Sequence, residues 1–217
     1  MNRSRRRLVR RALATLGLVL SVAGCNDSAS ELGGATTPST STTVSQRLLS
    51  EKELSAALLS LQDVPPGYSQ DPPSEPDPSK TFCDYVPPFQ EKIRVKREFT
   101  KGGGLSAEFL GVGFRQYADA GQAKATFEAL SNALASCTGE TYDGRRVSYA
   151  PMSAPKLGAG SVGVKITSDD GPDLLQFFAL LGPVLVNTGG GGMMNTNAEE
   201  VISLFKAQVG KYEAAAE

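Results

Sequence analysis

The sequence contains no histidine in its 217 residues and only three cysteines. Without histidine the chain lacks the usual general base of serine and cysteine hydrolases and the commonest protein ligand of transition metals. The cysteines form no C-x-x-C pair, which argues against a redox dithiol and against the ordinary zinc sites. The sequence therefore predicts a non-catalytic protein with no metal site and no cofactor.

Acidic residues are absent before Cys25, whereas six arginines occur there. Without this segment the chain has 16 basic and 23 acidic residues, a net charge of −7. Nucleic-acid phosphates require clustered lysine and arginine, so we expect no nucleic-acid partner.

The sequence also lacks an apolar run of the roughly 20 residues that a membrane-spanning helix needs. A basic head, a short apolar run at 12–23 and small residues before Cys25 are instead typical of a secretory signal. The ending Val22-Ala23-Gly24-Cys25 resembles a bacterial lipobox. This resemblance implies cleavage between Gly24 and Cys25 and a lipid on the Cys25 thiol, with residues 1–24 as signal peptide. "SRRRLVR" is either a twin-arginine signal or an ordinary basic head.

Large apolar residues are nearly absent from residues 25–46, which are rich in Ser, Thr and Gly. Such a segment cannot bury enough surface to offset its ordering entropy, so it predicts a disordered tether. About twenty flexible residues span on the order of 25 Å. Residues 47–217 are then the folded domain. "TTPSTSTT" is either a bare spacer or a site of O-glycosylation.

Local signals in residues 47–217 predict alternating helices and strands. Ser50 with Glu53 is a capping box, and Asp119 and Thr196 or Asn197 open two later helices. Alternation at 93–99 and 108–114 predicts strands, with a bulge near Gly111, and four more strands follow between 145 and 188. The predicted fold is α+β, an antiparallel sheet of about six strands with helices packed on one side.

Cys83 and Cys137 lie 54 residues apart, in a predicted loop and on the core face of a predicted helix. Export places them in an oxidising compartment, where two lone cysteines usually bridge. We therefore expect a structural disulfide, worth about 4 kcal/mol on the chain-entropy model.

Two motifs in the second half resemble catalytic signatures. "GAGSVG" at 158–163 matches G-x-G-x-x-G, but a turn precedes it and a strand pattern follows it, which favours a flexible turn over a nucleotide site. Ser161 also lies near a G-x-S-x-G pattern, where Lys165 on the same strand face is the nearest candidate base.

Three further stretches leave alternatives open. Carboxylates at 169–173 predict a turn, or less favourably a weak Ca²⁺ site. "GGGGMMN" at 189–195 predicts a loose connection, or a mobile lid over a ligand. The apolar run 174–186 indicates two central strands covered on both faces, or the lining of a lipid-sized cavity.

The layout of the whole chain resembles exported lipoproteins and receptor-kinase sensor domains of actinobacteria, the PknH-like sensor-domain family. The resemblance rests on the lipobox, the tether, "LLSEKELSAALLSLQDVPPGY", the helix "DAGQAKATFEALSNALASC" and the hairpin "FFALLGPVLVN". It implies an extracytoplasmic α+β domain with a central antiparallel sheet and a cleft suited to ligand sensing.

These observations predict a lipoprotein on the outer side of the cell membrane that binds a ligand or acts as a sensor module. Its partner would be a small molecule or an envelope protein. The alternatives are a lipid or glycolipid carrier that uses the apolar hairpin and a small envelope hydrolase with Ser161 as nucleophile.

Overall fold

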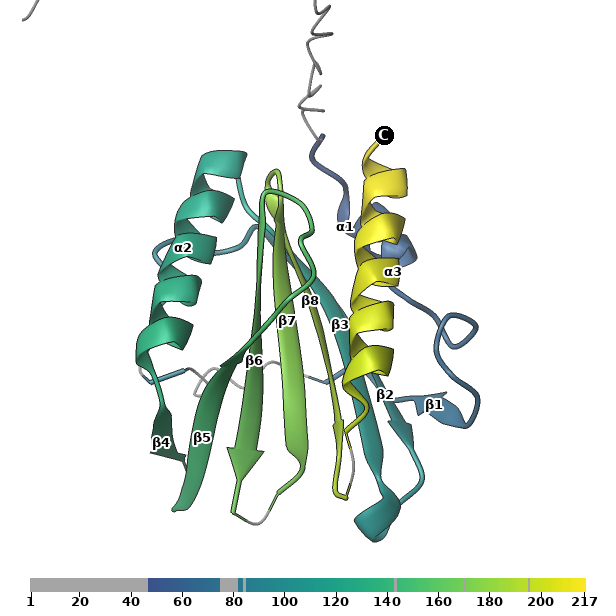
Figure 1. The fold of residues 1–217 in the computed structure, drawn as a ribbon. Coiled ribbons are helices and arrows are strands. Elements are labelled where there is room, and N and C mark those ends of the chain that lie inside the picture. Colours follow the sequence, from purple (N-terminus) through teal and green to yellow (C-terminus); the bar gives the residue numbers. More distant parts are fainter. Residues whose placement is uncertain (1–46, 75–81, 84, 143, 170, 195) are drawn as a thin grey trace, which may run out of the picture. The chain divides into compact units, whose positions relative to one another are not determined.

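The computed structural model describes residues 47–74, 82–83, 85–142, 144–169, 171–194 and 196–217. Eight antiparallel strands form one sheet in the order β1-β2-β3-β8-β7-β6-β5-β4 (Figure 1). The elements in chain order are α1 (Glu51–Ala57), β1 (Tyr68–Gln70), β2 (Ile93–Lys101), η1 (Gly104–Ser106), β3 (Glu108–Gln116), α2 (Ala120–Ser136), β4 (Gly139–Tyr142), β5 (Arg145–Met152), β6 (Gly160–Ser168), β7 (Asp173–Leu181), β8 (Val184–Gly192) and α3 (Ala198–Ala216).

The predicted α+β fold on an antiparallel sheet is confirmed, with eight strands rather than about six. The two extra strands are the short edge strands β1 and β4, of three and four residues. Segments this short carry too little alternation to be recognised in a sequence. The predicted bulge near Gly111 is wrong, since β3 pairs with β2 and β8 without a break from Glu108 to Gln116.

The helices lie over both faces of the sheet. The prediction of helices on one side holds for α1 and α3, which share one face of the sheet and contact Phe177 and its neighbours of the same parity. Helix α2 packs on the opposite face, against Phe178 and Leu180. Successive strand residues point to opposite faces, so the apolar run of β7 buries side chains in both layers. The prediction that this run forms central strands covered on both faces is confirmed.

The predicted helix starts are confirmed by their caps. Ser50 and Glu53 form the capping box of α1, and the Asp119 side chain accepts a hydrogen bond from the Gln122 N–H of α2. At α3, Asn197 is the cap rather than Thr196. In each case a short polar side chain pairs with an N–H group that has no partner within the helix.

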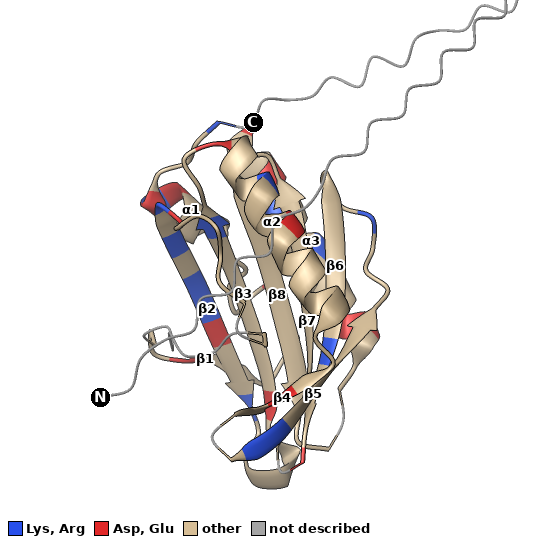
Figure 2. Cartoon of the chain, turned by 90° about the vertical axis from the view of Figure 1, so that its left-hand side faces the viewer, with Lys and Arg blue, Asp and Glu red and all other residues tan. Residues whose placement is uncertain are grey.

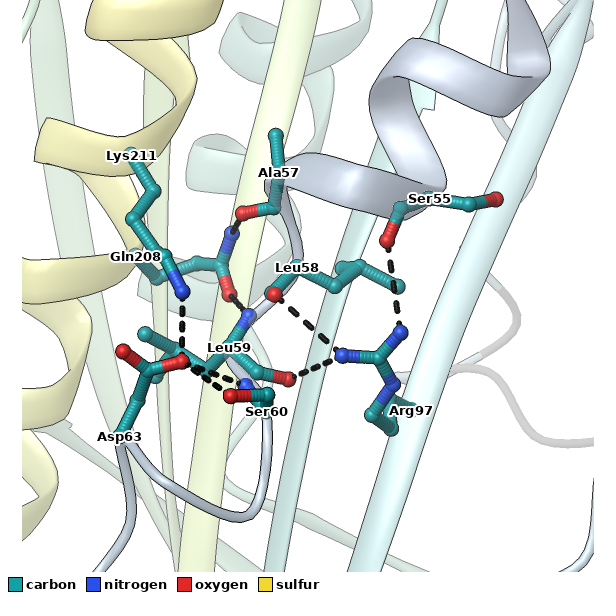
Figure 3. A network of polar contacts seen from close by, with 9 residues as sticks. All are labelled: Ser55, Ala57, Leu58, Leu59, Ser60, Asp63, Arg97, Gln208 and Lys211. Atoms are coloured by element: carbon teal, nitrogen blue, oxygen red, sulfur yellow. Dashed lines mark hydrogen bonds and ion pairs between the residues drawn. The ribbon is translucent and has the colours of Figure 1, made fainter.

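The apolar stripe of Leu54, Leu58 and Leu61 predicts a helix that continues to the Pro65-Pro66-Gly67 turn. Helix α1 instead ends at Ala57, because polar side chains bind the backbone that would continue it. The Arg97 guanidinium donates to the carbonyls of Ser55, Leu58 and Leu59, the last at 2.6 Å (Figure 3). Buried Gln208 of α3 accepts from the Leu59 N–H at 2.9 Å and donates to the Ala57 carbonyl at 3.1 Å. This network fixes α1 between β2 and α3.

Candidate functional site

Two predicted site residues, Gly24 and Cys25, lie outside the described residues. Signal cleavage and lipid attachment at Cys25 therefore stay predictions. Within the described ranges, no helix combines the length and apolarity needed to cross a bilayer.

The expected disulfide between Cys83 and Cys137 is present, with a Cα–Cα distance of 5.9 Å. It ties the loop that follows β1 to the C-terminal end of α2. The neighbouring Phe82 ring packs edge-on against Tyr149 and Phe178, with centroid distances of 5.3 and 6.4 Å. Aromatic packing beside the bridge indicates a structural role.

Ser161 and Lys165 do not form a catalytic pair. The Ser161 hydroxyl donates to the Pro155 carbonyl, and Lys165 Nζ lies 2.7 Å from a carboxylate oxygen of Asp173. Four residues along one strand separate the two side chains by roughly 13 Å. Because residues 160–163 of "GAGSVG" already belong to β6, the motif lacks the helix N-terminus that a dinucleotide site requires.

Acidic side chains do not gather into a cation site in the described ranges. No group of three His, Cys, Asp or Glu residues there is arranged to hold a metal ion. Within the predicted weak Ca²⁺ turn, Asp170 lies outside those ranges and Asp173 pairs with Lys165.

The glycine-rich stretch corrects a prediction, because Gly189–Gly192 are the last four residues of β8 rather than a loose connection or a lid. The glycines are required by close packing on the α3 face and at the end of the strand. A Cβ atom at Gly190 would lie 2.8 Å from both Leu110 and Val201, and one at Gly191 would lie 2.0 Å from the Asp173 carbonyl oxygen. Only residues without a side chain fit there.

On the α2 side of the sheet, part of the surface is left uncovered by α2. Gly111 of β3 and Gly189 of β8 are paired there at the middle of the sheet. No described atom lies within 4 Å of the position that a Cβ atom would take on Gly111. We call this surface the open face; its residues are Arg94, Lys96, Glu98, Gly111, Gly113, Arg115, Gln176, Asn187 and Gly189.

Charged side chains line the β2 side of the open face. Figure 2, which looks onto α2 and this side of the sheet, shows the Lys and Arg positions as blue bands along β2. Lys96 Nζ lies 3.2 Å from the Glu98 carboxylate and donates to Ser74 Oγ at 2.6 Å. Arg94 and Arg115 are direct cross-strand partners. The sequence shows the Arg94, Lys96 and Glu98 alternation, but it does not show that the next two strands contribute glycines beside it.

Two hollows lie elsewhere in the described part of the structure. Neither corresponds to the lipid-sized cavity that was an alternative for the apolar run 174–186. A hollow of about 380 Å³ lies between α1 and α3, lined mainly by alanines 56, 57, 214 and 215. A smaller one of about 20 Å³ lies near Tyr68 and Glu200. The hairpin 174–186 borders neither, because its side chains are packed between the helices on both faces.

Comparison with known proteins shows similarity of fold at low sequence identity. No family model matches the chain, and no curated protein is a significant match. The extracellular domain of PknH from Mycobacterium tuberculosis matches with a TM-score of 0.63 and 16% identity, over 78% of this chain and 99% of that one. A protein of Mycobacterium smegmatis, the Rv0999 ortholog, matches at 0.42 and 10%, over 75% and 96%. The chain thus has the fold of a receptor-kinase extracellular domain, and the expected PknH-like resemblance is confirmed.

Proposed function

We propose that the protein is a lipid-anchored, non-catalytic binding module on the outer side of the cell membrane, and that its ligand lies on the open face. The lipobox ending at Cys25 supports the anchor. The shared fold with the PknH extracellular domain supports a sensor-like module. A lipid anchor with more than one acyl chain holds a protein durably at a bilayer.

The observation that carries the binding proposal is the glycine pair at the centre of the sheet. A glycine within a strand costs roughly 0.5–1 kcal/mol relative to alanine and packs no side chain. Gly190 is explained by its contacts with Leu110 and Val201, whereas Gly111 meets no described atom. Bare backbone flanked by polar side chains is the arrangement expected where a ligand approaches a sheet closely.

The anchor is tested by fractionating cells that express either the natural chain or Cys25→Ala. The natural chain is expected in the membrane fraction with a lipid mass on Cys25, and the variant is expected to lose that mass. If the natural chain carries no lipid, the anchor proposal is wrong.

Ligand binding is tested by measuring thermal unfolding of the full-length protein in neutral detergent with water-soluble and lipid fractions of cell envelopes. A ligand that binds only the folded state raises the unfolding temperature. At least one fraction is expected to stabilise the natural protein but not Gly111→Leu, which fills the open face.

The matched control is Gly210→Leu, since Gly210 is an exposed glycine of α3 with no atom within 4 Å of an added Cβ. This variant is expected to respond to the fractions as the natural protein does. Equal responses of all three proteins, or no response in any, would overturn the binding proposal.

A further inference from the structure

Two arginines lie side by side at one end of the open face. Arg94 of β2 and Arg115 of β3 are direct cross-strand partners, and both point away from the α1 and α3 layer, because their neighbours Val95 and Phe114 belong to its core. Like charges directly opposite each other destabilise an antiparallel pair. The sheet therefore carries an unfavourable pair at this position.

Among the described residues one acidic side chain forms an ion pair with these arginines, and the charge of Glu98 also acts on Arg94. Glu91 Oε1 lies 3.6 Å from Arg94 Nη1. Among the described residues, Arg115 has no carboxylate within ion-pair distance and makes no side-chain hydrogen bond. Arg115 therefore has no ion-pair partner in the described part of the chain.

The neighbouring arginine also makes the charge of Arg94 less favourable. Desolvation, followed by the charge of Arg115, lowers the pKa of Arg94, although an arginine stays protonated at physiological pH. Nearby, burial and then Tyr117 raise the pKa of Tyr85 to about 12, opposed by Arg115. The Tyr85 hydroxyl is therefore protonated and donates to the Thr126 carbonyl. Burial likewise raises the pKa of Tyr117, so neither tyrosine supplies a negative charge to the arginines.

A polar row adjoins the arginines along the open face. The next cross-strand row consists of Lys96, Gly113 and Asn187. A Cβ atom at Gly113 would lie 2.8 Å from Asn187 Oδ1, so the absence of a side chain there lets the amide lie against the strand. The Asn187 amide thus covers Gly113, and the open backbone of Gly111 lies one row further along the same face.

We propose that Arg94 and Arg115 bind a phosphate group, carried by a soluble ligand or by a lipid headgroup. Guanidinium groups bind phosphate oxygens with paired N–H···O bonds, and a phosphate supplies the negative charge that this pair lacks. The inference rests on the proposed function, since it names the chemistry recognised at one end of the open face.

The experiment is calorimetric titration of the full-length protein in neutral detergent with inorganic phosphate at constant ionic strength. Hydrogen bonds to charged groups are worth about 1.5–3 kcal/mol, so Arg115→Gln is expected to weaken binding by about tenfold to hundredfold. Arg115→Lys keeps the charge but loses the paired bonds and is expected to bind with intermediate affinity.

The matched control is Arg145→Gln, because Arg145 is an exposed arginine at the start of β5, near the far edge of the sheet. It is expected to bind phosphate as the natural protein does. No measurable binding, or equal affinity of the natural protein and Arg115→Gln, would overturn the inference.

The two sources of phosphate are separated by a second titration with glycerophosphoglycerol, the soluble headgroup of an anionic phospholipid. Tighter binding of this diester than of inorganic phosphate supports a lipid headgroup, and the reverse supports a soluble ligand.

The inference and the proposed function fail in different ways. If phosphate binds through Arg115 but no envelope fraction stabilises the natural protein, the phosphate site stands and the proposed function fails. If an envelope fraction stabilises the protein in a Gly111-dependent way but phosphate does not bind, the function stands and the phosphate inference fails.

Discussion

Gly111 of β3 lies directly opposite Gly189 of β8, at the middle of an eight-stranded sheet and on the side that α2 only partly covers. On the other side of the same strand, Gly190 lies beneath Val201 of α3. Two neighbouring glycines of β8 thus have different physical explanations. Close packing with α3 requires Gly190, whereas Gly189 lies beside Gly111 on the open face, where an added Cβ atom would be 3.2 Å from Gln176 Cγ.

Alanine at Gly111 and alanine at Gly190 are expected to change the free energy of unfolding in opposite directions. Gly111→Ala should raise the free energy of unfolding by roughly 0.5–1 kcal/mol, since alanine costs less than glycine in a strand and no described atom obstructs it. Gly190→Ala should lower it by about 1–3 kcal/mol, because the methyl group would overlap Leu110 and Val201. Urea unfolding of both variants checks this. A destabilised Gly111→Ala would show that the position is not open.

Opening the disulfide is expected to destabilise the fold considerably. The bridge between Cys83 and Cys137 closes a long loop, which corresponds to about 4 kcal/mol on the chain-entropy model. Unfolding with and without a reductant measures this difference, and a double Cys83→Ser, Cys137→Ser variant should be insensitive to the reductant. If reduction leaves the natural protein unchanged, the disulfide contributes nothing to its stability.

Gln208 is expected to be the polar residue on which the position of α1 depends most. Gln208→Leu leaves the Leu59 N–H and the Ala57 carbonyl without their partner, at a cost of about 1–3 kcal/mol for each buried group. Hydrogen exchange of the Leu59 amide should accelerate in this variant. The control is Lys206→Leu on the exposed side of α3, which should change neither quantity. Unchanged exchange at Leu59 in Gln208→Leu would contradict this account.

The carboxyl group of Asp63 is expected to make stability depend on pH in the acid range. Burial raises its pKa, but hydrogen bonds from Lys211 and Ser60 outweigh burial and lower the pKa to about 2, from an ordinary 3.8. The unfolded chain therefore binds more protons between these values, so this contribution is complete above about pH 4 and is lost as the pH falls towards 2. Unfolding free energies of the natural protein and Asp63→Asn should converge over this window. Parallel curves would contradict the shift.

Local signals sufficed to predict the helix starts, because the capping side chains bind backbone three residues away. Local signals also sufficed to predict that the apolar run 174–186 forms central strands. Residues of both parities in β7 are apolar, so both faces of the strand must be covered. The end of α1 could not be predicted from local signals. It depends on Arg97 and Gln208, which are distant in the chain and bind the carbonyls at the end of the helix.

The open face could not be predicted from the sequence either, because it also depends on the pairing of residues that are distant in the chain. The run of glycines at 189–192 is typical of a loop, and only its pairing with β3 and β7 makes it a strand. The alternation at 93–99 is enough to place Arg94 on the polar side of its strand. That Arg115 lies opposite it depends on the register of β2 with β3, which no local pattern reveals.

The most direct test of a ligand on the open face is photocrosslinking in cells, with a benzophenone amino acid at Gly111 or at Gly210. Both glycines have space for an added side chain, but only Gly111 lies on the open face. The account predicts a reproducible adduct of one mass at position 111 that is absent at position 210. No adduct at 111, or the same adducts at both positions, would contradict it.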